Sequence, residues 1–188
     1  MSLLRRVLAA FAVGLTIVTV SPTAAHAQTG PTRIIAINPF LPLLGSFQAE
    51  FEKKLQANLS IAVSASYLDL GDDDSNRYTN ADVKLRLYPA ERALDGFGIA
   101  AGLGIGSQST VPFLDCIGVN APCRNTRVSR TGPAFSVEMQ YQWLLGKKQN
   151  TAVAVGGGAK RYFISDTANE DFNDFMPTLR LTIGYAFR

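Results

Sequence analysis

Large apolar residues alternate with polar or small residues along eight stretches of the chain. A period of two is typical of β-strands that present one apolar face. The stretches are RIIAIN (33–38), SFQAEFEK (46–53), NLSIAVSASYL (58–68), ADVKLRLY (81–88), GFGIAAGLGIG (96–106), AFSVEMQYQW (134–143), TAVAVGGGAKRYF (151–163) and TLRLTIGYAF (178–187). The first is the weakest, because Pro39 and Pro42 follow it. The pattern predicts an all-β chain with eight strands.

The connections between these stretches are of two kinds. Residues 53–58, 89–95 and 145–150 form short turns, whereas residues 69–80, 107–131 and 165–176 form longer polar loops. Long and short connections alternate strictly from the third strand onward, and a short proline-rich link (39–45) joins the first two strands. Short turns at one end and long loops at the other predict an eight-stranded antiparallel up-and-down barrel of the transmembrane kind.

The direction of the two faces separates a membrane barrel from a soluble one. A soluble barrel that binds a small apolar ligand would turn its large apolar residues inward; its pocket would then be lined by Phe47, Phe51, Phe135, Trp143 and Tyr185. A membrane barrel turns them toward lipid and fills its narrow interior with polar or small residues. The second face is rich in glycine and alanine, which make a poor solvent-facing surface and favour the membrane reading.

Charged residues of both signs lie on that same face, where they can pair as buried charges require. The predicted interior network contains Glu50, Asp82, Lys84, Arg86, Glu138, Lys160 and Arg180, and Glu52 shares their face. Such a network would plug the lumen. The small glycine-lined sector beside the fifth and seventh strands leaves room for water, and we expect at most a weak, low conductance.

Aromatic residues gather at the predicted strand ends. If both termini are periplasmic, the inner (periplasmic) interface of the outer membrane holds Phe97, Tyr141, Trp143, Tyr185 and Phe187. The opposite interface holds Tyr67, Phe135 and Phe163. Two aromatic girdles are typical of membrane barrels.

The N-terminus has the layout of a cleaved signal peptide. Arg5 and Arg6 precede an apolar run at residues 7–20, and the small residues Ala25 and Ala27 end the leader. The run is too short for a spanning helix, which takes about 20 residues. We therefore expect export, a leader at 1–27 and one barrel domain at 28–188, located in the bacterial outer membrane. Removal of the leader with its two arginines lowers the formal charge from +3 to +1. No cluster of lysine and arginine in the sequence indicates nucleic-acid binding.

The chain resembles the small outer-membrane β-barrel proteins of the OmpA/OmpX-like class. The resemblance rests on the eight-strand pattern, on the opening INPFLPLLGSFQAEFEKKL and on a final strand of alternating apolar residues that ends in an aromatic, although Arg188 follows that aromatic. It implies that Leu181, Ile183, Tyr185 and Phe187 form an insertion signal for the barrel-assembly machinery. It also implies outer-membrane lipid and lipopolysaccharide as partners.

The long loops carry three further candidates. Cys116 and Cys123 predict a disulfide in an oxidising compartment, since a metal site on two cysteines without histidine is the weaker reading. Arg124, Arg127 and Arg130 are candidates for lipopolysaccharide phosphates. The acidic stretch at 71–76 and the carboxylates at 166–174 predict solvated loops with a possible role in bridging cations to the same phosphates. An unknown surface partner remains open.

The absence of histidine from the predicted mature chain disfavours a catalytic role. The single histidine, His26, lies in the leader. Side chains other than histidine need a large pKa shift to act as a general base near neutrality. We therefore predict a non-catalytic protein without cofactor or metal, and a structural or surface-binding role. An envelope-lipid-modifying enzyme that uses a carboxylate pair such as Glu50 and Glu138 is the third alternative, after the soluble barrel.

Overall fold

The structure, a computed structural model, describes residues 30–69, 77–90, 92–110, 128–163 and 175–188. The predicted signal peptide, both cysteines, Arg124, Arg127 and the acidic loop stretches lie outside the described residues. The elements are β1 (Arg33–Ile37), the 3₁₀-helix η1 (Leu41–Leu44), β2 (Phe47–Lys54), β3 (Leu59–Asp69), β4 (Arg77–Leu87), β5 (Gly96–Thr110), β6 (Val128–Leu145), β7 (Thr151–Tyr162) and β8 (Phe175–Phe187).

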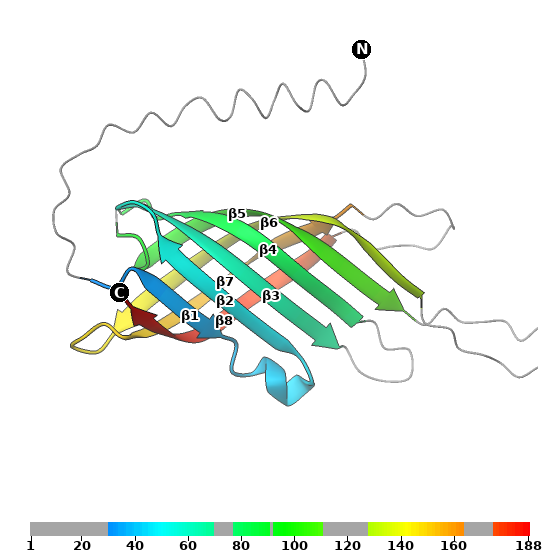
Figure 1. The fold of residues 1–188 in the computed structure, drawn as a ribbon, viewed down its shortest axis with the longest axis horizontal. Helices are drawn as coiled ribbons and strands as arrows, with labels where there is room; N and C mark the ends of the chain where they lie inside the picture. Colours follow the sequence, from blue (N-terminus) through cyan, green and yellow to red (C-terminus); the bar gives the residue numbers. More distant parts are fainter. Residues whose placement is uncertain (1–29, 70–76, 91, 111–127, 164–174) are drawn as a thin grey trace, which may run out of the picture.

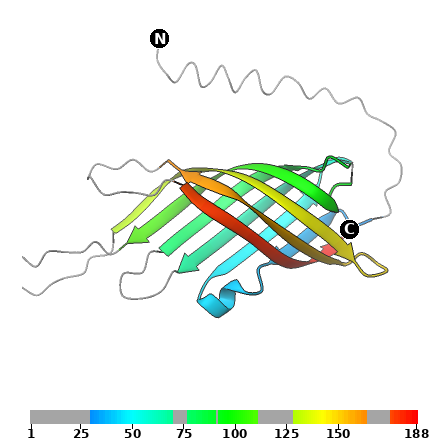
Figure 2. The ribbon, with the colours of Figure 1, turned by 180° about the vertical axis from the view of Figure 1, so that it is seen from behind.

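The eight strands form a closed antiparallel barrel in chain order, with β1 pairing with β8. Figures 1 and 2 show the tilted strands from opposite sides, with the C-terminus at one end of the barrel. The predicted all-β, eight-stranded up-and-down fold is confirmed. The C-terminal strand completes the wall, because Arg33 lies opposite Phe187 and Ile37 lies opposite Ile183. No helix within the described residues is long and apolar enough to cross a membrane.

The apolar side chains of the strands face outward. On β4, Val83, Leu85 and Leu87 are exposed, whereas Asp82, Lys84 and Arg86 between them are buried. The five residues expected to line the pocket of a soluble barrel are all exposed on the outer wall: Phe47, Phe51, Phe135, Trp143 and Tyr185. The prediction of an inward apolar pocket in the alternative reading is therefore wrong, because the alternation puts polar residues inside.

Several strands extend further into the predicted long loops than their hydrophobic pattern indicates. Residues 77–80 belong to β4, residues 107–110 to β5 and residues 128–131 to β6. Most residues of these extensions are polar, so the period-two signal is lost while the backbone pairing continues. Hydroxyl groups bridge the extended strands: the Oγ atoms of Ser109 and Ser129 lie 3.0 Å apart, and Thr131 Oγ1 donates to Ser107 Oγ at 3.0 Å.

An apolar plug closes the barrel at the end that holds the termini. The turn after β4 folds inward, so that Leu94 is fully buried against Ile34, Ala36, Ala152 and Ala186. Leu94 has a φ of 75°, a left-handed conformation that is costly for a residue with a Cβ. Its carbonyl oxygen accepts a hydrogen bond of 2.8 Å from Gln142 Nε2. The turn is thus part of the interior.

Candidate functional site: the barrel interior

The interior above the plug begins with a cluster around Glu52 of β2. Arg86 Nη1 lies 2.5 Å from Glu52 Oε2. The hydroxyls of Ser60 and Tyr88 donate to Glu52 Oε1 at 2.5 and 2.7 Å. Period-two strands put these groups on one face, because Glu52 and Ser60 lie on neighbouring inward positions. All four residues are buried, and the carboxylate is surrounded by donors.

Glu50 connects the strands on both sides of β1. Its Oε1 accepts from Nη1 and Nη2 of Arg86, each at 3.1 Å, and its Oε2 accepts from Nη1 of Arg180 on β8. Lys84 Nζ lies 3.8 Å from Glu50 Oε2. A carboxylate shared by three cations joins β2, β4 and β8 across the lumen.

Lys84 and Asp82 carry the network to the other wall. Lys84 Nζ lies 2.5 Å from Glu138 Oε1 of β6 and 3.4 Å from Asp82 Oδ1. Asp82 also accepts from Lys160 Nζ of β7 at 2.7 Å and from Ser64 Oγ of β3 at 2.6 Å. The contacts extend from β2 to β8 around most of the barrel.

The charges of the interior balance. Among the described residues, the buried carboxylates are Glu50, Glu52, Asp82 and Glu138, and the buried cations are Lys84, Arg86, Lys160 and Arg180. Each of the eight takes part in at least one ion pair. Removing one member leaves an uncompensated buried charge, which costs about 3–5 kcal/mol. The network therefore has no net formal charge, and each of its charges has a partner of opposite sign.

The inward glycines of β5 make room for long side chains from the neighbouring strands. A Cβ at Gly102 would lie 2.6 Å from Ser136 Oγ and 2.8 Å from Lys84 Cγ. At Gly106 a Cβ would overlap the ring of Tyr162. At these two positions Lys84, Ser136 and Tyr162 fill the space that the missing side chains leave. That the glycine-rich sector holds water stays a prediction.

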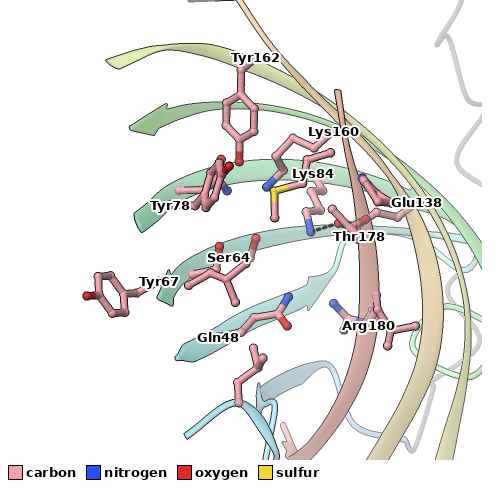
Figure 3. Close-up of a pocket in the computed structure, with 17 residues that line it drawn as sticks. Gln48, Ser64, Tyr67, Tyr78, Lys84, Glu138, Lys160, Tyr162, Thr178 and Arg180 are labelled. Atoms are coloured by element: carbon pink, nitrogen blue, oxygen red, sulfur yellow. Dashed lines mark hydrogen bonds and ion pairs between the residues drawn. The ribbon is translucent and has the colours of Figure 1, made fainter. Parts of the chain in front are cut away.

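Open space lies at the loop end, above the ion network. A cavity of about 270 Å³ is lined by side chains of η1, β2, β3, β4, β6, β7 and β8, and most of its accessible surface is apolar. Figure 3 shows Lys84, Lys160 and Glu138 on one side of it, with Gln48 and Arg180 pointing toward one another from β2 and β8. Tyr78 and Tyr162 lie farther toward the loop end.

Four buried polar atoms of this lining have no hydrogen-bond partner among the described residues. They are Asn80 Oδ1, Glu138 Oε2, Thr178 Oγ1 and Arg180 Nε. Buried polar groups are normally paired with protein or with ordered water. Arg86 Nε, Ser136 Oγ and Gln140 Oε1, which lie outside this lining, also have no partner among the described residues, so such atoms are not confined to the cavity.

The structure brings all seven predicted network residues together inside the barrel. It adds groups that the sequence reading did not single out as a site, which are Ser60, Ser64, Asn80, Tyr88, Gln140, Gln142 and Tyr162. Each of them occupies a strand position, or the position next to a strand end, of the same parity as the charged residues, so the alternation could have identified them as interior residues. Of the predicted girdle residues, Phe97, Phe135, Tyr141, Trp143 and Phe163 are exposed on the outer wall, and Tyr67 is half-buried. Ile183 and Tyr185 of the predicted insertion signal are exposed, and Leu181 and Phe187 are half-buried.

The buried carboxylates of the interior are all paired with cations. Each buried carboxylate is held by at least one cation, and within the described ranges no group of three histidine, cysteine or acidic side chains is placed to hold a metal ion. Lys84 lies between Glu50 and Glu138, with its Nζ 3.8 Å from Glu50 Oε2 and 2.5 Å from Glu138 Oε1. The fold and its interior define a closed β-barrel of inverted polarity, with an apolar exterior and a charged core.

Comparison with known proteins gives one structure to report. The chain is similar to the crystal structure of the N-terminal β-barrel domain of Pseudomonas aeruginosa OprF, with 12% identity and a TM-score of 0.47, over 84% of this chain and 98% of that chain. No protein-family model and no curated protein matches the sequence.

Proposed function

We propose that the protein spans the bacterial outer membrane as a non-catalytic β-barrel, with a structural or surface-binding role carried by its loop end. One observation carries the proposal: the wall is apolar outside, and every buried charge of the described interior has an opposite charge beside it. In water this arrangement would expose the apolar wall and bury the charges. In a membrane, the apolar wall contacts lipid and the paired charges lie inside the barrel.

The height of the apolar wall supports a membrane span. On β6 the outward residues from Phe135 to Leu145 are apolar or aromatic, and they span ten positions. Ten positions correspond to about 33 Å along a strand, or about 25 Å along the axis at a tilt of about 40°. Above Phe135, the outward Thr131 and Ser129 are polar. The apolar band thus matches the hydrocarbon thickness expected of a membrane barrel.

Aromatic contacts support the position of the two interfaces. The rings of Tyr141 and Trp143 lie 4.7 Å apart, and those of Tyr185 and Phe187 lie 6.2 Å apart, all near the end with the termini. At the other end, the guanidinium of Arg161 lies 5.4 Å from the centre of the Phe163 ring. Amphipathic aromatic rings and arginines prefer the membrane–water boundary.

The proposed partners are outer-membrane lipid, lipopolysaccharide and the barrel-assembly machinery. The outward positions of Ile183 and Tyr185 on the closing strand support recognition of this strand during insertion. We expect Tyr185→Asp to reduce the amount of inserted protein more strongly than Thr151→Asp, an exposed residue opposite it in the register. Equal insertion of both variants would argue against the role of this strand.

Heat-modifiable gel mobility tests the proposal. A closed membrane barrel extracted with detergent should migrate at a different apparent size before and after boiling, and should resist extraction by salt or alkaline carbonate. Release into the soluble fraction without detergent would contradict the membrane location. A catalytic role would be supported by an envelope-lipid-modifying activity that is lost in Glu138→Gln while the barrel still shows the mobility shift.

A further inference from the structure

Two cations lie opposite each other on the outer wall, at the end of the barrel that holds the termini. Arg33 of β1 is the register partner of Lys53 of β2, and both side chains are exposed. Their strands run side by side next to the C-terminus (Figure 1). Like charges on directly opposite residues of neighbouring strands destabilise a sheet. The pair would therefore be stabilised by an anion that contacts both side chains.

The backbone pairing brings the two side chains close together. Lys54 N donates to the Thr32 carbonyl at 2.8 Å, so these two residues form a hydrogen-bonded pair. Hydrogen-bonded and non-hydrogen-bonded pairs alternate along an antiparallel ladder, which makes Arg33 and Lys53 a non-hydrogen-bonded pair. Side chains are closest at such positions, where the Cα atoms lie about 4.5 Å apart. Both cations can therefore reach the same phosphate group.

The described protein does not compensate these two charges. In the described part of the chain, no ion pair includes Arg33 or Lys53. Glu52, the neighbour of Lys53 in sequence, is buried inside the barrel and pairs with Arg86. Asp95, in the turn after β4 at the same end, pairs with Arg92 at 2.6 Å. A partner of opposite charge therefore has to come from outside these residues.

The pair lies at the depth of the lipid head groups. Tyr185, which we place at the inner interface, is the register partner of Ile35, and Ile35 is the partner of Phe51. Arg33 and Lys53 are two positions beyond this level, toward the termini. Two positions correspond to about 7 Å along a strand and about 5 Å along the axis at a tilt of about 40°. The head-group region extends about 5–7 Å beyond the hydrocarbon on each side of a bilayer.

Apolar side chains of the wall lie directly beside the two cations. Ile35 and Phe51 are 52% and 38% exposed, and they are the next outward residues on the same two strands. On β8, Phe187 is the register partner of Arg33, and its ring stacks on that of Tyr185 at 6.2 Å. A ligand that contacts both cations can therefore continue along an apolar surface toward the middle of the membrane. This combination fits a lipid phosphate rather than a free phosphate ion.

The charge of the site indicates the kind of head group. A phosphodiester carries one negative charge and accepts charge-assisted hydrogen bonds from arginine and lysine. The head group of phosphatidylethanolamine adds an ammonium, whose positive charge would lie beside two cations, whereas that of phosphatidylglycerol adds only hydroxyls. Three further cations at this end of the barrel, Lys54, Lys147 and Lys148, also favour a lipid of net negative charge.

We propose that Arg33 and Lys53 bind the phosphate of an anionic phospholipid in the leaflet on the side of the termini, with its acyl chains along Ile35 and Phe51. The site depends on the proposed membrane location. If that location is wrong, the heat-modifiable shift is missing. If only the site is wrong, the shift remains and the preference for anionic lipid at these residues is absent.

A tryptophan placed in the site provides a local probe. The single native tryptophan is removed by Trp143→Phe, and the reporter is introduced by Phe51→Trp. The mature protein would be refolded into phosphatidylcholine vesicles that contain increasing fractions of phosphatidylglycerol or of phosphatidylethanolamine, each brominated near the head group. We expect phosphatidylglycerol to reach half-maximal quenching at an about fivefold lower fraction, since a lysine or arginine near the membrane surface attracts anionic lipid by about this factor.

Matched variants separate the site from the overall charge of the protein. Arg33→Gln combined with Lys53→Gln should reduce the preference to below about twofold, whereas Arg33→Lys combined with Lys53→Arg keeps both charges and should retain it. Arg92→Gln removes a paired cation at the same end and should leave the preference unchanged. Native Trp143 lies on β6, opposite β2 across the barrel, so its quenching should not respond to the two glutamine substitutions.

The comparison of the two brominated lipids in the reporter protein decides even if the double glutamine variant does not fold. Equal quenching of the reporter by both lipids would overturn the proposal. So would an unchanged preference in the folded double glutamine variant, or an equal loss of preference at Trp143, which would show an effect of total charge rather than of this site.

Discussion

The side chain of Lys84 crosses Gly102 to reach Glu138. Lys84, Gly102 and Ser136 lie in register on β4, β5 and β6, and Lys84 Nζ ends 2.5 Å from Glu138 Oε1. The ion pair bridges two strands that are not neighbours. It is possible only because the strand between them presents a glycine to the lumen.

Gly102→Ala should therefore destabilise the barrel. The new Cβ would lie within 2.8 Å of Lys84 Cγ and closer still to Ser136 Oγ, so that one of them must move. We expect a loss of about 1–3 kcal/mol, measured by urea unfolding from lipid vesicles. Gly98→Ala on the same face is the control, because its Cβ would meet Arg86 and Tyr88 at 3.3 Å and needs only a small adjustment. Equal stability of the two variants would argue against this packing.

Neutralising one member of the interior network should cost far more than breaking a surface pair. Asp82→Asn removes a buried partner of Lys84 and Lys160, and we expect a loss of about 3–5 kcal/mol. Arg92→Gln breaks the pair of Arg92 with Asp95, in which Arg92 is well exposed, and we expect a change below about 1 kcal/mol. The comparison uses the same unfolding assay. A small effect of Asp82→Asn would show that the buried lysines do not depend on Asp82 for charge compensation.

Leu94 and Gln149, the two non-glycine residues with a left-handed backbone in the described part of the chain, should respond in opposite ways to replacement by glycine. Leu94→Gly relieves the backbone cost of a φ of 75° but removes a fully buried side chain. We expect a net destabilisation of about 1–3 kcal/mol, because a lost core leucine outweighs the strain. Gln149→Gly, at a φ of 53° in a polar turn, loses no core packing and should be neutral or stabilising by up to about 1 kcal/mol. A stabilised Leu94→Gly would mean that the plug packs loosely.

Much of the fold could be predicted from the alternation of residues along the strands. Leu85 and Arg86 sit on opposite faces because successive strand residues point in opposite directions, so one parity assignment places a whole strand. The charged interior followed from the same rule. Whether the apolar face meets lipid or lines a pocket had to be argued separately, from the small residues on the second face and the aromatic residues at the strand ends.

The features that could not be predicted break that rule or do not depend on it. Residues 107–110 pair as a strand although neither face is apolar. Leu94 lies in a short polar turn, and its burial depends on a left-handed backbone that the sequence does not indicate. The pairing of β8 is longer with β7 than with β1, because β1 ends at Ile37, where Pro39 follows, whereas β8 already begins at Phe175. Strand lengths, unlike strand faces, are set by pairing between distant parts of the chain.

The single tryptophan, Trp143, allows the most direct test of the central claim that the outer wall faces lipid. Its side chain is exposed on β6 beside Tyr141, at the level that we place at the inner interface. The protein would be reconstituted in vesicles of phospholipid brominated either near the head group or near the chain end, and Trp143 fluorescence would be recorded. We predict strong quenching by both lipids, with more quenching when the bromines lie near the head group. Fluorescence that neither brominated lipid quenches, in protein that remains folded, would contradict the lipid-facing barrel.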